Sequence, residues 1–422
     1  IYQKFRNKEA GASLIAIILQ GDKSRLYITP DPDQEILAKE AFPGWVPRLE
    51  MEQNSRDLLS GRGYGIKFWH ELFSNRQLVA LTTNSELIRD IFRDNPQVQK
   101  QSSYDSVIRL FLAFTLDKCA DYWSSICSWH NSKALIRNTF GRQAIPMVWD
   151  YAEVNPFSDS TGNWLSMLDW VVKALLNCSC YNNGHVELAN AYSQNISKNK
   201  VISTDPPYYD NISYAELSDF FYIWLRYMIA NDYPSLFETV LVPKEQELIS
   251  LRYRHSDLKS AEKYFLDGMQ QTMRLLSSVS NNAYPMTIYY AYKQSDSTEA
   301  GNASTGWVTF LAAVINSDLA IMGTWPMRTE LANKVSGVSS NMLASSIILV
   351  CRNRNADAES VSRKDFLREL NQAIPEALNT MINGSETSSP IAPVDLAQAA
   401  IGPGMAVFSK YKAILESDGS PM

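Results

Sequence analysis

Residues 200–226 read KVISTDPPYYDNISYAELSDFFYIWLR, in which two prolines separate a strand pattern from a helix pattern. Residues 201–204 are small or β-branched, which predicts a short buried strand. A residue before proline avoids the helical region and proline fixes its own φ, so Asp205, Pro206 and Pro207 are expected to form a stiff ledge. The ledge would lie at the strand's carboxyl end, where open α/β sheets bind ligands.

A helix is expected to follow this ledge. Ser213 and Glu216 have the spacing of a capping box, and Ile212 and Leu217 have that of a hydrophobic staple. Apolar residues then recur at helical spacing, namely Leu217, Phe220, Phe221, Trp224, Leu225 and Met228. The ledge is therefore predicted to connect a buried strand to a well-capped amphipathic helix.

The residue types of the ledge suit an amine attached to an aromatic ring. Such an amine is a poor nucleophile because its lone pair is delocalised into the ring. The carboxylate of Asp205 and the carbonyl of Pro206 can each accept one of its hydrogens, which favours a lone pair that points at an electrophile. The ring of Tyr208 offers a flat face for a base that has left its duplex. An ordinary turn at the end of a strand is the alternative interpretation.

The stretch Asp205-Pro206-Pro207-Tyr208 resembles the D-P-P-Y signature of S-adenosylmethionine-dependent amino methyltransferases that act on adenine N6 or cytosine N4. Together with VWDYAEVNPFSDSTGNW before it, and TWPMRTE, ASSIILVCRNR and DLAQAAIGPGMAVFSKY after it, the sequence resembles the large adenine-specific DNA methylases that carry a zinc ribbon and occur in phage-defence loci. The likeness extends from about residue 62 to residue 422 and is weaker before that.

The resemblance implies a DNA (adenine-N6) methyltransferase with S-adenosylmethionine as cofactor and DNA as partner. Asp205, Pro206, Pro207 and Tyr208 would be catalytic. The residues expected to bind the substrate are Tyr208, Tyr209, Asp210 and Asn211. Cytosine N4 or an RNA base remains an alternative target, because the same ledge serves any amine on a ring. A non-catalytic module for DNA recognition or scaffolding in a defence complex is the alternative from another class.

The implied fold is α/β, the later half of a Rossmann-like methyltransferase sheet with helical insertions and a helical C-terminal region. The sequence divides into a β-containing tail (1–60), a helical insertion (61–135), the catalytic core (136–356) and the C-terminal helices (357–422). Strands are expected at residues 285–292, 319–325 and 345–351, and the resemblance makes the last two antiparallel. Asn163 is expected to cap a helix whose buried face is Trp164, Leu168, Val171, Val172 and Leu175.

A glycine-rich turn for the methyl donor is missing from the sequence. In the family, the donor-binding block and the zinc ribbon precede the region that this chain covers. We therefore expect the chain to be an internal fragment that is inactive alone and binds S-adenosylmethionine weakly or not at all. The strand at Val201 would then have an open edge where another strand should pair.

The composition indicates a globular protein, with 45% hydrophobic and 20% charged residues in 422. We see no segment of membrane-spanning length and no signal peptide in the sequence. Five cysteines without framework spacing favour reduced thiols and a cytoplasmic location. Cys178-x-Cys180 with His185 has poor spacing for zinc, so no metal site is predicted.

The net charge of −6 requires that a DNA-binding protein of this kind segregate its positive charge. Two basic clusters are candidates, although each is more often an ordinary solvated surface. They are Lys4, Arg6 and Lys8, and Arg352, Arg354, Arg363 and Lys364.

Overall fold

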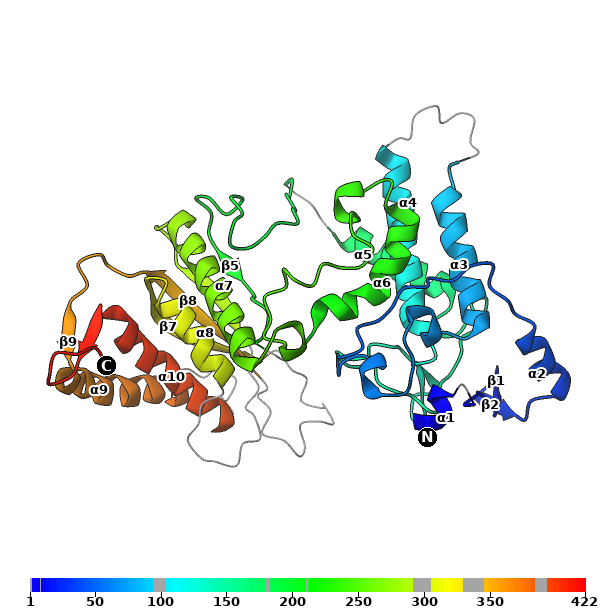
Figure 1. The fold of residues 1–422 in the computed structure, drawn as a ribbon, viewed down its shortest axis with the longest axis horizontal. Helices are drawn as coiled ribbons and strands as arrows, with labels where there is room; N and C mark the ends of the chain where they lie inside the picture. Colours follow the sequence, from blue (N-terminus) through cyan, green and yellow to red (C-terminus); the bar gives the residue numbers. More distant parts are fainter. Residues whose placement is uncertain are drawn as a thin grey trace. The chain divides into compact units, whose positions relative to one another are not determined.

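The computed structural model describes residues 2–7, 9–93, 103–178, 182–209, 212–290, 305–328, 345–383 and 393–422. They fall into two compact units (Figure 1). Unit 1 comprises Ile1–Leu188 and Ile212–Glu247, and unit 2 comprises Ala189–Asn211 and Leu248–Met422. The expected catalytic core, residues 136–356, contributes to both units.

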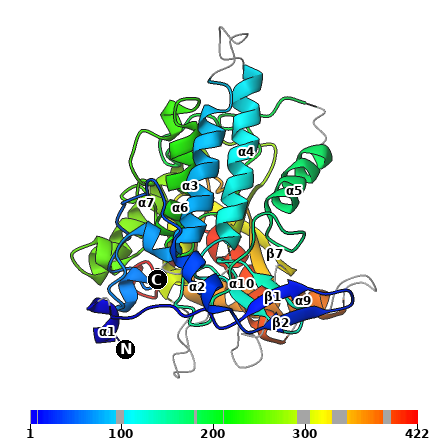
Figure 2. The ribbon, with the colours of Figure 1, turned by 90° about the vertical axis from the view of Figure 1, so that its right-hand side faces the viewer.

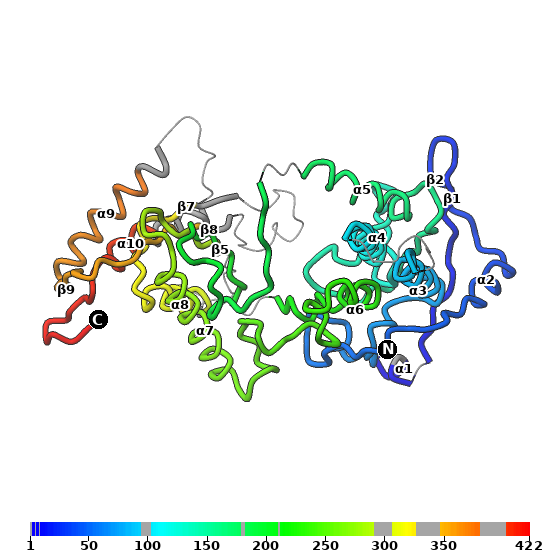
Figure 3. The backbone as a smooth tube through the Cα atoms, turned by 90° about the horizontal axis from the view of Figure 1, so that it is seen from above, coloured from blue at the N-terminus to red at the C-terminus, as the bar shows by residue number. Residues whose placement is uncertain are grey.

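Three long helices form the centre of unit 1, and Figures 2 and 3 show them side by side. They are α3 (Asn75–Asp90), α4 (Ser103–Tyr122) and α6 (Tyr214–Ile229). The apolar face predicted for α6 is confirmed, since Leu217, Phe220, Trp224 and Met228 are buried. Phe73 stacks on Phe220 at 5.5 Å between ring centroids and meets the ring of Trp224 edge-on. These aromatic contacts fix α6 in the core of unit 1.

The capping box predicted for α6 is wrong. The hydroxyl of Ser213 makes no capping hydrogen bond to its own helix. It donates instead to the carboxylate of Asp57 at 2.9 Å, and the Ser213 amide donates to the same carboxylate at 3.2 Å. The carboxylate of Glu247 accepts the amide of Ala215 at 3.0 Å. Distant acidic side chains thus satisfy the amides that a local cap would have satisfied.

The remaining elements of unit 1 are short. They are α1 (Tyr2–Arg6), β1 (Ile17–Gln20), β2 (Arg25–Ile28), α2 (Pro32–Lys39), η1 (Ser60–Arg62), η2 (Trp69–Leu72), β3 (Ser128–His130), β4 (Leu135–Arg137), α5 (Trp164–Asn177) and η3 (Pro234–Leu236). Strands β1 and β2 form an antiparallel hairpin, and so do β3 and β4.

Helix α5 has the expected cap but not the expected buried face. The side chain of Asn163 accepts a hydrogen bond from the amide of Ser166 at 2.8 Å. Of the face predicted to be buried, Val172 and Leu175 are exposed, while Trp164, Leu168 and Val171 are only partly covered. Met167 is the buried position of this helix. Helical spacing correctly predicted an amphipathic helix, but it could not indicate how much of that face its own unit covers.

Unit 2 contains a four-stranded sheet in the order β5-β6-β8-β7. Its strands are β5 (Ser203–Thr204), β6 (Met286–Tyr290), β7 (Leu319–Arg328) and β8 (Ser345–Asn353). Strands β5 and β6 are parallel, with Ser203 opposite Thr287 and Thr204 opposite Ile288. Strand β8 runs antiparallel to both β6 and β7. The expected antiparallel pairing of the last two strands is therefore confirmed, and β5 lies at one edge of the sheet.

Two helices pack against this sheet and supply half of the buried residues in the apolar core that they share with it (Figure 1). They are α7 (Leu258–Val279) and α8 (Thr305–Ile315), and the one-turn helix η4 (Arg252–Arg254) precedes α7. Alternate residues of β6, namely Met286, Ile288 and Tyr290, point into this core. The period of two is that of a strand with one face buried.

The C-terminal region adds helices α9 (Arg363–Asn383) and α10 (Pro393–Lys410) and the parallel strands β9 (Ser360–Ser362) and β10 (Ala413–Leu415). Helix α10 lies against β7, where the hydroxyl of Ser409 accepts the amide of Ile321 at 2.7 Å. The chain is thus of mixed α/β class. No helix among the described residues is long and apolar enough to cross a membrane.

Replacing Asp57 by Ala should lower the free energy of unfolding by about 1–3 kcal/mol, because the amide and hydroxyl of the buried Ser213 would lose their acceptor. Urea unfolding followed by tryptophan fluorescence measures this, since Trp69, Trp123 and Trp224 are buried in unit 1. Asp22→Ala, at an exposed turn, is the matched control and should change little. Equal stability of the two variants would contradict the role given to Asp57.

Candidate functional site

The predicted ledge begins directly after β5, at the edge of the sheet where parallel strands present their carboxyl ends. Asp205 follows Thr204, the last residue of β5. Because β6 runs parallel to β5, its last residue, Tyr290, lies toward the same edge. Ligands of open α/β sheets bind outside this edge. The structure therefore places Asp205 where the sequence analysis expected it.

Two hydrogen-bond acceptors of the ledge are unused within the described part of the chain. The carboxylate of Asp205 is exposed and receives no hydrogen bond or ion pair from any described residue. Pro206 is buried, and its carbonyl likewise accepts no hydrogen bond from them. Adjacent acceptors of this kind can receive the two hydrogens of one amino group.

Although Asp205 is exposed, neighbouring atoms partly desolvate its carboxyl, and this raises the pKa of the carboxyl above its ordinary value by disfavouring the charged form. Shifted pKa values of this kind are common at functional sites, where side chains are often partly desolvated. The ionised carboxylate is the stronger acceptor, so the site should lose most of this role as the pH falls through the raised pKa.

Tyr208 is half-buried and lies on an aromatic cluster under the ledge. Its ring meets that of Tyr290 edge-on, with 5.8 Å between centroids and an angle of 81° between planes. Tyr290 in turn stacks on Phe310 of α8 at 4.0 Å and 7°. Tyr290 and Phe310 are buried, so they hold the ring of Tyr208 at the boundary between core and solvent.

Tyr209 is held more firmly than Tyr208. Its carbonyl accepts the amide of Ser250 at 2.7 Å, and its ring meets Phe265 of α7 edge-on at 5.1 Å. The ring also lies so close to Gly306 that a Cβ there would approach two of its atoms, Cγ and Cδ1, to 2.9 Å. Tyr209 thus fixes the end of the ledge against α7 and α8. The other two residues expected to bind the substrate, Asp210 and Asn211, lie outside the described residues.

Two members of this site, Tyr290 and Gly306, were not predicted from the sequence. A signal for Tyr290 was present, because it lies within the strand expected at residues 285–292. Gly306 had no usable signal, since only the fold reveals its contact with the Tyr209 ring.

The other candidate sites of the sequence are not assembled by the described residues. Cys178 is exposed, His185 pairs with Glu187 at 3.3 Å, and Cys180 lies outside the described ranges. Among the residues described, no three His, Cys, Asp or Glu side chains are grouped so as to hold a metal ion. Burial raises the pKa of the Cys351 thiol to about 12, so it stays protonated at neutral pH.

All four arginines of the basic clusters bind the protein itself. The Nε of Arg6 donates to the carbonyl of Gly63, and Nη1 of Arg352 donates to that of Asn282. Arg363 forms an ion pair with Glu416 at 3.3 Å. Lys8 lies outside the described residues.

In comparisons with known proteins, no family model, curated protein or solved structure matches the chain.

Gly306→Ala should lower the free energy of unfolding by about 1–3 kcal/mol, because the new methyl group would overlap the base of the Tyr209 ring. Gly404→Ala, in α10, is the control: its Cβ would find only ordinary contacts at 3.6 Å, and Ala is the better helix former. Thermal unfolding should therefore separate the two variants. A Gly306→Ala protein as stable as the control would show that Tyr209 does not pack as described.

Proposed function

We propose that this chain is the base-binding part of a site-specific DNA methyltransferase that transfers a methyl group from S-adenosylmethionine to adenine N6. The observation that carries the proposal is the pair of unused acceptors, the Asp205 carboxylate and the Pro206 carbonyl, beside the half-buried ring of Tyr208. The antiparallel final strands, as the resemblance to D-P-P-Y methyltransferases implies, support the same proposal.

Asp205 and Pro206 would each accept one hydrogen of the adenine amino group. With both hydrogens engaged, the nitrogen becomes more pyramidal and its lone pair is directed away from the ring. On methyl transfer the lone pair would form the new N–C bond while the bond from the methyl group to the donor's sulfur breaks, the sulfur keeping that electron pair, and one of the two hydrogens would leave as a proton. Pro207 would keep the two acceptors at a fixed separation, because its φ is restricted.

Tyr208 would stack on the flipped base. An extruded base loses its stacking on neighbouring base pairs, and an aromatic side chain restores part of that energy. The contact with Tyr290 holds the Tyr208 ring from below, so less freedom is lost when a base arrives.

The methyl donor would supply an electrophilic methyl group, and we assign no donor-binding residues within this chain. Those residues would belong to another part of the complete protein. The complete protein would act in the cytoplasm, in restriction-modification or in another form of phage defence. Its partners would include other defence proteins. Cytosine N4 and RNA bases are the alternative targets of the same chemistry.

Asp205→Asn in the complete protein should lower methyl transfer to duplex DNA by roughly a hundred-fold or more, because a neutral amide is a weaker acceptor than a carboxylate. Purified protein and a radiolabelled donor measure this. In the wild type, the rate should fall as the pH drops through the raised pKa of Asp205. Retained activity in the variant would exclude the role of Asp205.

The same substitution should not weaken the fold. An acid whose pKa is higher in the folded than in the unfolded state makes folding less favourable once the pH exceeds the unfolded value. Asp205→Asn should therefore unfold at an equal or higher temperature at pH 7, and the difference should vanish below about pH 4. This control separates loss of function from loss of structure.

Tyr208→Phe should keep most of the methyl-transfer activity, whereas Tyr208→Ala should lower it by about ten-fold or more. Stacking requires the ring and not the hydroxyl, and a base stacked on an aromatic ring gains about 1–3 kcal/mol. Rates of the two variants at subsaturating DNA provide the comparison. If the Phe and Ala forms were equally active, the stacking role would be refuted.

A further inference from the structure

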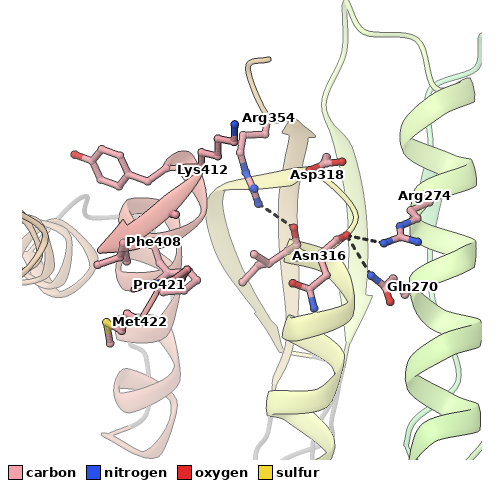
Figure 4. Close-up of a pocket in the computed structure, with 13 residues that line it drawn as sticks. Gln270, Arg274, Asn316, Asp318, Arg354, Phe408, Lys412, Pro421 and Met422 are labelled. Atoms are coloured by element: carbon pink, nitrogen blue, oxygen red, sulfur yellow. Dashed lines mark hydrogen bonds between the residues drawn. The ribbon is translucent and has the colours of Figure 1, made fainter. Parts of the chain in front are cut away.

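A second polar site lies in unit 2, away from the ledge. It is a pocket of about 460 Å³ between α7, the turn from α8 to β7, and the C-terminal segment (Figure 4). Its charged lining consists of Arg274, Arg354, Lys412 and Asp318. Three cations and one carboxylate give the lining a net positive charge in a chain whose net charge is −6.

The pocket lies at the ends of the strands opposite to those that carry the ledge. Arg354 directly follows the last residue of β8, and Asp318 directly precedes the first residue of β7. Strand β8 is antiparallel to β5 and β7 is parallel to it, so both positions are at the amino-terminal edge of β5. The pocket and Asp205 therefore lie at opposite ends of the strands, and Asp205 is not among the residues that line the pocket.

Arg354 is fixed by the protein but keeps donors to spare. Its Nε donates to the carbonyl of Ser409 and its Nη2 to that of Ile315, both at 2.9 Å. Its Nη1 donates to no described residue. A guanidinium held by backbone carbonyls is pre-organised, so little freedom is lost when the remaining N–H groups bind an anion.

The turn beside Arg354 adds to this arrangement. Asp318 has a φ of +58°, in the left-handed region that non-glycine residues seldom adopt, and its carbonyl accepts the amide of Arg354 at 2.7 Å. Backbone strain of this kind persists where the surroundings enforce it, often at ligand-binding sites. Figure 4 shows Gln270 and Arg274 of α7 turned toward the carbonyl of Asn316 in the same turn.

Two further cations of the pocket, Arg274 and Lys412, form no ion pair with any described residue. Arg274 is exposed, and its contact with the Asn316 carbonyl is long, at 3.5 Å. The ammonium group of Lys412 is exposed and pairs with no described residue. Arginine and lysine groups that form no ion pair with a carboxylate are suited to binding phosphate.

We propose that this pocket binds a phosphate group, and that the phosphate belongs to the DNA backbone. The choice of DNA rests on the proposed function, because a protein of net charge −6 must present positive charge locally to hold duplex DNA. A free phosphate would be bound by the same groups. Contacts to phosphate position the protein on DNA without reading its sequence.

The test uses the 422-residue chain with Arg274→Gln and Lys412→Gln combined, and leaves Arg354 in place because it supports the fold. The control combines Lys198→Gln and Lys259→Gln, two exposed lysines of the same unit, and so removes the same net charge. Binding of a labelled DNA duplex is measured by anisotropy at several salt concentrations. Binding of inorganic phosphate is measured by calorimetry.

The pocket variant should bind the duplex about ten-fold more weakly than the control, with a salt dependence shallower by about one unit per lost phosphate contact. If only phosphate binding is lost, the pocket stands as a phosphate site whose ligand is free phosphate. If the variant equals the control with both probes, the proposal is overturned. Asp205→Asn should keep pocket binding, so a failure of the methyl-transfer proposal remains distinguishable from a failure of this one.

Discussion

The parallel pairing of β5 with β6 is the constraint on which the candidate site depends. Only two residue pairs form it, Ser203 with Thr287 and Thr204 with Ile288. Their register sets where Asp205 leaves the sheet and brings Tyr290 to the same edge. Strand β6 is also hydrogen-bonded along its length to β8, so the rest of the sheet fixes the position of the short edge strand β5. The position of the ledge therefore depends on the core that the sheet forms with α7 and α8.

That core gives the ledge its stiffness at one end and leaves its acceptors open at the other. Tyr209 is held by α7 and by the glycine of α8, while Tyr208 rests edge-on against Tyr290. Asp205 and Pro206 lie three and two positions before Tyr208 in the chain, and neither the Asp205 carboxylate nor the Pro206 carbonyl has a partner among the described residues. A site with rigid support and unsatisfied acceptors is prepared for a ligand with two hydrogens to donate.

Local sequence patterns predicted much of this fold and only part of the site. Proline geometry placed the ledge after a strand, and spacing of apolar residues predicted α6 and its buried face. The patterns failed where distant residues compete with local ones: Asp57 takes the hydroxyl of Ser213, so the capping box does not form. They also could not show that Val172 and Leu175 of α5 stay exposed, or that Gly306 meets Tyr209. Such contacts join segments that are far apart in the chain and leave no periodic trace.

The most direct test of the central claim is nucleoside mass spectrometry of DNA from cells that express the complete protein, beside cells that express its Asp205→Ala form. We predict that N6-methyladenine rises only in the first. If N4-methylcytosine rises instead, the role given to the ledge stands, and the target base is cytosine and not adenine. No modified base in either culture, with both proteins folded, would contradict a methyltransferase role for the ledge and favour a DNA-recognition module.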